Sequence, residues 1–384
     1  MRPITLIIVM NRWPTTLSSA LNVVGPYVAH KVAVVDQSAG LESLDGEQSG
    51  HFDRIRYVAR GSLDELRNLS LELAREFDAS AWALSVDCDE FIDAKSILAL
   101  HALADSSDRI SAFVLPCYNY VGQGRWATTY SFRLLRLSDP VEFSHAIHES
   151  ISASLVRNSL AWSYGNAPIQ HLDFLNPVTG KRQQYRTLLE AAIERGRDLA
   201  FLKTLLAMEC SWAGDDELAL LHLEEAISLA SEPLQSGRFS GRDDFPVFLK
   251  AQILARGGRL KEAEAQWMRL YAIAEQRVRA EAALALAAIA TQVGDHIRAL
   301  KWADESLSLW RSAEGYFSRA TTLCALKARD RAYDDILAGI ELNPMAGDRR
   351  IQGSMAESGT SRLQCLLNPE FSGLPNLVRA LSTL

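Results

Sequence analysis

The sequence has few of the features that mark secreted, membrane-spanning or nucleic-acid-binding proteins. Its five cysteines are scattered and include no Cys-x-x-Cys pair, so neither a disulfide framework nor a zinc site is indicated. No apolar run is long enough to span a bilayer. There are 40 Lys and Arg against 47 Asp and Glu, a formal net charge of −7, so no basic field would attract nucleic acid. We therefore expect a cytoplasmic protein without a transmembrane segment and without a nucleic-acid partner. Peripheral contact with a membrane stays open.

The length of 384 residues predicts two domains. The composition changes near residue 180, where Ala, Leu, Glu and Arg begin to dominate. We place an α/β domain at 1–180 and an all-α repeat domain at 181–384.

Strand and helix patterns alternate in the N-terminal half. Ser62 precedes one helix and Glu65 lies three residues on, which is a capping box. The alternation is typical of a doubly wound α/β sheet. The first four strands are expected at 4–10, 31–36, 54–59 and 82–86, with helices over 15–24 and 62–77, and shorter strands at 111–116, 132–137 and 142–148.

An acidic cluster follows the fourth expected strand. Asp87, Asp89, Glu90 and Asp93 place four carboxylates within seven positions, and these repel one another unless a cation lies between them. In open α/β sheets, ligands bind at the carboxyl ends of strands. Hard oxygen ligands at such a place suit Mg²⁺ or Mn²⁺, so the Asp-Cys-Asp triplet predicts a divalent metal site.

Several short motifs, taken in order, resemble the family-2 glycosyltransferases with a GT-A fold, in the subgroup with a C-terminal tetratricopeptide-repeat tail. The resemblance runs from about residue 4 to about residue 186. The matching motifs are Asn11-Arg12 after the first strand, Val34-Val35-Asp36, Leu66-Arg67-Asn68-Leu69-Ser70-Leu71, Asp87-Cys88-Asp89-Glu90, Ala146-Ile147-His148-Glu149, and Gln170-His171 before a basic helix.

This resemblance implies a metal-dependent, inverting transfer of a sugar from a nucleotide diphosphate. A UDP-sugar is the expected donor, and a glycan, peptide or small molecule the expected acceptor. A divalent Mn²⁺ or Mg²⁺ would neutralise the departing diphosphate, and a carboxylate base would deprotonate the acceptor. The implied site residues are Asp89, Asp87 and His171 for the metal, Asp36, Arg67, Asn68 and Asp87 for the donor, and Glu149, with His148 as alternate, for catalysis.

The sequence departs from the family pattern around the expected nucleotide pocket. The loop from Asp36 to Glu42 lacks a securely placed second acid, and Met10-Asn11-Arg12 replaces the family's Lys-Asn-Glu. These changes support an alternative, a non-catalytic scaffold whose α/β domain is degenerate and whose repeats bind a protein. A nucleotidyltransferase of similar fold would need a Gly-rich loop after the first strand, and residues 11–14 do not form one.

The C-terminal half repeats a pattern of helix, Gly-containing turn and helix. The period is about 34 residues, as in tetratricopeptide repeats, with a longer insertion at 233–245. Such arrays present a concave surface to a peptide or protein. Bracing of the catalytic domain and homodimer formation are the alternatives. The clearest copies are 202–229 and 283–309, and weaker ones are 248–272 and 315–344.

Overall fold

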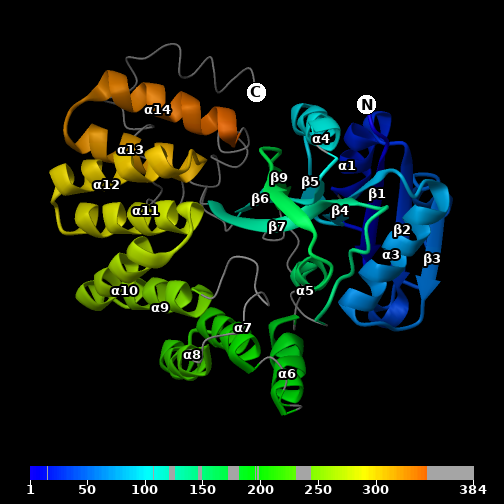
Figure 1. Ribbon diagram of the computed structural model, residues 1–384, viewed down its shortest axis with the longest axis horizontal. Helices are drawn as coiled ribbons and strands as arrows, with labels where there is room; N and C mark the ends of the chain where they lie inside the picture. The colour runs from blue at the N-terminus through cyan, green and yellow to red at the C-terminus, as the bar shows by residue number, and fades with distance from the viewer. Residues whose placement is uncertain are drawn as a thin grey trace. The chain divides into compact units, whose positions relative to one another are not determined.

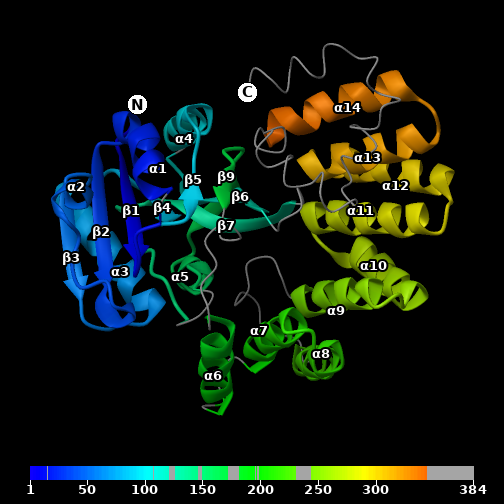
Figure 2. The same cartoon turned by 180° about the vertical axis from the view of Figure 1, so that it is seen from behind.

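The computed structural model describes residues 1–14, 16–106, 108–120, 126–145, 149–171, 181–194, 196, 199–230 and 244–343. The chain forms two compact units, one from each half of the sequence (Figures 1 and 2). The predicted domain boundary after residue 180 comes at the end of the stretch 172–180, which lies outside the described residues.

The N-terminal unit contains a nine-stranded mixed sheet, which confirms the expected α/β class. Strand order is β3-β2-β1-β4-β7-β6-β9-β5, and β8 also pairs with β6. The strands β3, β2, β1 and β4 run parallel, and β7 is antiparallel to β4. The strands are β1 (Ile4–Met10), β2 (His30–Asp36), β3 (Arg54–Val58), β4 (Trp82–Asp87), β5 (Glu90–Phe91), β6 (Ile110–Tyr120), β7 (Trp126–Arg136), β8 (Ala161–Tyr164) and β9 (Ile169–His171).

Helices cover both faces of this sheet. Helices α1 (Leu17–Val24) and α4 (Ala94–Ser106) share one apolar core with the sheet. On the other face, α3 (Leu63–Phe77) and α5 (Ser152–Arg157) share a second. All seven residues of β1 are buried, which explains why its sequence is a continuous apolar run rather than an alternating one. Short segments α2 (Gly46–Ser49), η1 (Gly25–Tyr27) and η2 (Gln37–Ala39) complete the unit.

The expected strand at 142–148 is wrong for the part of it that the structure describes. Within residues 142–145, only Ser144 makes a bridge, to Ser150. The backbone just before this segment is held by a side chain of α3: Arg75 donates hydrogen bonds to the carbonyls of Leu137 and Val141. By contrast, the capping box of Ser62 and Glu65 at the start of α3 is confirmed.

The C-terminal unit consists of tetratricopeptide-like helical repeats. Helices pack in successive pairs, α7 with α8, α9 with α10, α11 with α12, and α13 with α14. Gly214, Gly258 and Gly294 turn the first three pairs with positive φ, and Lys327 takes this position in the fourth. The helices are α6 (Lys181–Glu194), α7 (Leu199–Trp212), α8 (Asp216–Ala230), α9 (Phe245–Arg256), α10 (Leu260–Ile273), α11 (Gln276–Gln292), α12 (His296–Leu309), α13 (Ala313–Ala325) and α14 (Arg329–Leu342).

None of the described helices combines the length and the hydrophobicity that crossing a bilayer requires. The predicted insertion at 233–245 lies mostly outside the described residues.

Close packing of α13 against α14 requires glycine at position 339. A Cβ added there would lie 2.4 Å from Cε1 of Phe317, so Gly339→Val should lower the free energy of unfolding by about 1–3 kcal/mol. Chemical denaturation of the full chain, followed by circular dichroism, measures this. The matched control is Gly46→Val, because a Cβ at Gly46 meets no atom within 4 Å. Equal effects of the two substitutions would contradict the packing argument.

Candidate functional site

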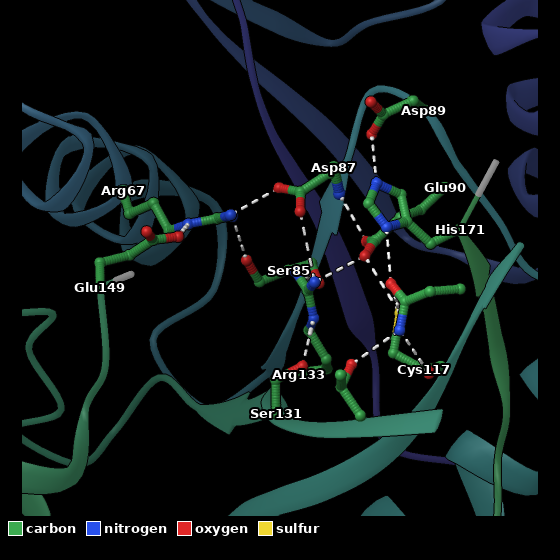
Figure 3. A network of polar contacts seen from close by, with 12 residues as sticks. Arg67, Ser85, Asp87, Asp89, Glu90, Cys117, Ser131, Arg133, Glu149 and His171 are labelled. Carbon is green, nitrogen blue, oxygen red and sulfur yellow. Dashed lines mark hydrogen bonds and ion pairs between the residues drawn. The ribbon is translucent and has the colours of Figure 1, made fainter. Parts of the chain in front are cut away.

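A cluster of charged side chains lies at the carboxyl ends of β1 and β4. Asp87 is the last residue of β4, and Arg12 follows β1 by two positions. Strand β1 lies between β2 and β4, so the chain order reverses there. This is the topological switch point where open α/β sheets bind their ligands. Figure 3 shows the central part of the cluster.

Arg67 of α3 connects three parts of the N-terminal unit. Its side chain is 5% exposed and forms ion pairs with Asp87 and Glu149. It also donates to Ser85 Oγ over 2.8 Å. The guanidinium therefore joins α3 to the end of β4 and to the segment that carries Glu149 (Figure 3).

A β-bulge directs Arg133 into the same cluster. The pairing of β6 with β7 shifts between Phe113 and Val114, so that Arg133 has no partner in the register. Bulges redirect side chains in this way. Nη2 of Arg133 lies 2.6 Å from Glu90 Oε1 and 3.3 Å from Asp87 Oδ2. The two oxygens of Asp87 thus face two different arginines.

Asp89 lies between Arg12 and His171. Its Oδ2 accepts a hydrogen bond from Arg12 Nη2 at 2.8 Å, and its Oδ1 lies 3.4 Å from His171 Nε2. The other ring nitrogen of His171 is 2.8 Å from Asn119 Oδ1. Antiparallel pairing of β5 with β9 places His171 opposite Glu90, and this brings it beside Asp89.

Cationic and hydrogen-bonding neighbours keep the two aspartates ionised. Burial alone would raise the pKa of Asp87, but Arg67 and Arg133 outweigh burial and hold that pKa well below its ordinary value. Burial likewise opposes ionisation of Asp89, whose pKa is nevertheless lowered, chiefly by the hydrogen bond with His171. Both aspartates are therefore carboxylates at neutral pH.

Glu90 and the nearby cysteines are shielded from solvent. Glu90 is 2% exposed, and burial raises its pKa. Its Oε2 accepts the backbone N–H of Asp87 over 2.8 Å. Burial raises the pKa of Cys88 to about 12 and that of Cys117 well above its ordinary value. Because nucleophilic attack requires a thiolate, neither cysteine is suited to it.

The side chains as arranged do not fit a divalent ion. Within the described ranges, no three His, Cys, Asp or Glu side chains gather as ligands of one ion. Of the predicted ligands, Asp89 and His171 are adjacent, but both oxygens of Asp87 accept hydrogen bonds from guanidinium groups. The predicted Mg²⁺ or Mn²⁺ stays a prediction, and we derive no step through a metal.

The structure brings together most of the site residues expected from the sequence. Asp87, Asp89, Arg67, Glu149 and His171 all belong to the cluster. The predicted role of each stays a prediction.

Two predicted donor contacts have other partners. Asp36 ends β2 and accepts the backbone N–H of Ser38. The amide group of Asn68 donates to and accepts from the backbone of Phe143, so it holds the segment before Glu149. His148 lies outside the described residues.

Sequence reasoning recognised neither Arg12 nor Arg133 as a partner of the acids. The position of Arg133 between Phe132 and Leu134 was a partial signal, because an arginine that becomes buried needs an acidic partner. Ser85 and Asn119 gave no comparable signal.

Arg67→Met should destabilise the N-terminal unit strongly. It leaves Glu149, 11% exposed, and Asp87 without their shared cation, and breaking a buried pair costs on the order of 3 kcal/mol. Urea denaturation measures the loss. Arg54→Met is the matched control, because Arg54 and its partner Glu76 are 49% and 53% exposed and such pairs contribute below about 1 kcal/mol. A loss as small as that of the control would show that Arg67 is not a structural link.

The contact of His171 with Asp89 should make stability depend on pH. Burial lowers the pKa of His171, but the hydrogen bond with Asp89 and the negative charges of Glu90, Asp89 and Asp87 together outweigh burial and raise it. A raised pKa stabilises the fold below the unfolded value of about 6.5, and this contribution disappears as the pH rises through the folded pKa. His171→Asn should therefore cost about 0.5–1 kcal/mol near pH 5.5 and less near pH 8.5. Urea denaturation at both pH values is the measurement, and a larger loss at the higher pH would contradict it.

Comparison with known proteins adds little about this site. No protein-family model matches the chain, and no curated protein matches it. Among solved structures, a crystal structure of MamA is similar with a TM-score of 0.34 and 14% identity over 43% of this chain and 90% of that one. The TPR protein YrrB, described as having an unusual peptide-binding site, is similar with a TM-score of 0.33 and 18% identity. The match covers 51% of this chain and 98% of that one. A chain of the APC/C hetero-tetramer Cut9–Hcn1 is similar with a TM-score of 0.38 and 15% identity. The match covers 53% of this chain and 36% of that one. Similarity at these TM-scores establishes no relationship for this chain.

Proposed function

We propose that the N-terminal unit is a glycosyltransferase that moves a sugar from a nucleotide diphosphate to an acceptor hydroxyl. The observation that carries the proposal is the location of the charged cluster at the switch point between β1 and β4. Open α/β sheets bind nucleotides at this place. The resemblance of the motifs to GT-A glycosyltransferases supports the same function, with a UDP-sugar as the expected donor.

The residues of the cluster have complementary roles in this proposal. Arg12, at the edge of the cluster and 27% exposed, would meet the diphosphate, because guanidinium groups match phosphate oxygens. Asp87 would accept hydrogen bonds from the donor's hydroxyl groups. It is 33% exposed, so part of the carboxylate remains accessible from the carboxyl edge of the sheet.

Glu149 is the proposed general base. The acceptor oxygen would attack the anomeric carbon and give its proton to the carboxylate. The bond from the anomeric carbon to the diphosphate would break, and the nucleotide diphosphate would leave with the electron pair. Glu149 is suited to this role because its contact with Arg67 holds it close to Asp87. Inversion at the anomeric carbon rests on the resemblance alone.

The second candidate function is that of a scaffold or adaptor. The tetratricopeptide-like repeats favour it, since such repeats commonly bind a protein partner or a second copy of the chain. The pairing of Asp87 with two arginines is also compatible with a degenerate site. In this case nucleotides would not bind, and the repeat unit alone would carry the function.

A panel of nucleotide-sugars tests donor binding. Each donor is supplied with and without Mn²⁺. Binding is measured as a shift of the melting temperature, and turnover as the release of nucleotide diphosphate. Asp89→Asn should reduce the thermal shift caused by the nucleotide, because it removes the charge that holds Arg12. Asp108→Asn is the control, since Asp108 is 82% exposed and bonds only Arg2 in the described contacts. No shift and no turnover with any donor would favour the scaffold.

Glu149→Gln separates binding from transfer. The amide oxygen can still accept from Arg67, so donor binding should persist. A base typically contributes at least about 100-fold to the rate, so kcat should fall by that factor or more. Turnover equal to that of the wild type would remove Glu149 as the base.

A further inference from the structure

We infer that arginines take the place of a divalent cation in this site, so that the nucleotide-diphosphate ligand binds without a metal. This inference rests on the proposed function, because it concerns the ligand of the same cluster. It runs against the expectation from the sequence, where four closely spaced carboxylates predicted Mg²⁺ or Mn²⁺.

The acids of the cluster already have cationic partners. Asp87 contacts Arg67 and Arg133, Asp89 contacts Arg12, Glu90 contacts Arg133, and Glu149 contacts Arg67. Three guanidinium groups therefore compensate four carboxylates, and His171 lies against Asp89 as a further partner. For Asp87, Asp89 and Glu90, the mutual repulsion that would have to be relieved by a metal is relieved by side chains of the chain itself. Asp93, the fourth acid of the sequence cluster, accepts the backbone N–H of Ser96 instead.

These arginines are held in place by other contacts. Arg67 also donates to Ser85, and Arg133 also donates to Ser131 over 2.9 Å. Their side chains are 5% and 11% exposed. To ligate a metal, Asp87 would have to give up at least one of them. A buried guanidinium would then be left beside a divalent ion, and like charges at such distances repel by several kcal/mol at a dielectric constant of about 20.

The anionic ligand has cations to bind at the edge of the cluster. A guanidinium carries five N–H groups, and the structure assigns Arg67 three hydrogen bonds, to Glu149, Ser85 and Asp87. Of Arg12, Arg67 and Arg133, Arg12 has the most exposed side chain, at 27%. Arg12 can therefore contact a phosphate group at the switch point while it retains its acid partner Asp89.

Calorimetric titration with UDP, GDP, ADP and dTDP in EDTA, and again with excess Mn²⁺, tests the inference. We expect one of them to bind in EDTA with an affinity within about threefold of that in Mn²⁺, and the affinity to fall with added salt. Mn²⁺ titrated alone should produce no binding heat. Binding that appears only with Mn²⁺ would overturn the inference and leave the proposed function intact. Absence of binding in both conditions would overturn both.

Two variants locate the binding cations. Arg12→Gln should weaken nucleotide binding in EDTA by about tenfold, the size of one charge-assisted contact, without affecting the more buried arginines. Arg133→Met should also weaken nucleotide binding in EDTA. It should in addition create measurable binding of Mn²⁺ alone, because it frees one oxygen of Asp87. Arg54→Met is the control, and its affinity should equal that of the wild type. If Arg12→Gln binds as tightly as the wild type, or if wild-type protein binds Mn²⁺ alone as well as Arg133→Met does, the arginines do not replace the metal.

Discussion

The buried guanidinium of Arg67 neutralises two carboxylates that lie far apart in the sequence. Asp87 ends β4, whereas Glu149 belongs to a segment that follows the last residues of the β6–β7 hairpin. Removing charges from water is costly unless each has a well-placed partner. Helix α3, strand β4 and the Glu149 segment therefore have to adopt their positions together. The polar contacts of Asn68 and Arg75 with the same segment reinforce this dependence.

This constraint also decides what kind of ligand the site can take. Both oxygens of Asp87 and one oxygen of Asp89 accept hydrogen bonds from arginines, so these acids act first as anchors that fix the guanidinium groups. Fixed guanidinium groups at the carboxyl edge of a parallel sheet favour an anion with two or more oxygens in a plane. A nucleotide diphosphate, the ligand proposed for this site, has such oxygens.

Much of the fold was predictable because local patterns are strong in this chain. The continuous apolar run of Ile4–Met10 predicted a buried parallel strand, and β1 is buried throughout. The capping box at Ser62 fixed the start of α3. Residues 142–145, the described part of an expected strand, were misjudged because their pattern matches a strand. The backbone of Glu142 and Phe143 instead bonds to side chains of α5 and α3, which no local pattern indicates. Strands β5 and β9 are only two and three residues long, too short for periodicity to show.

The sequence alone determined the classes of structure and the acids at the end of β4. Both follow from properties of neighbouring residues: periodicity, capping and the close spacing of carboxylates. Only the tertiary structure decided which cation compensates those acids. Arg12, Arg67 and Arg133 come from three different elements, and the bulge that directs Arg133 exists only when β6 pairs with β7. Electrostatic partners are set by distance in space, and distance in space depends on how the strands are ordered in the sheet.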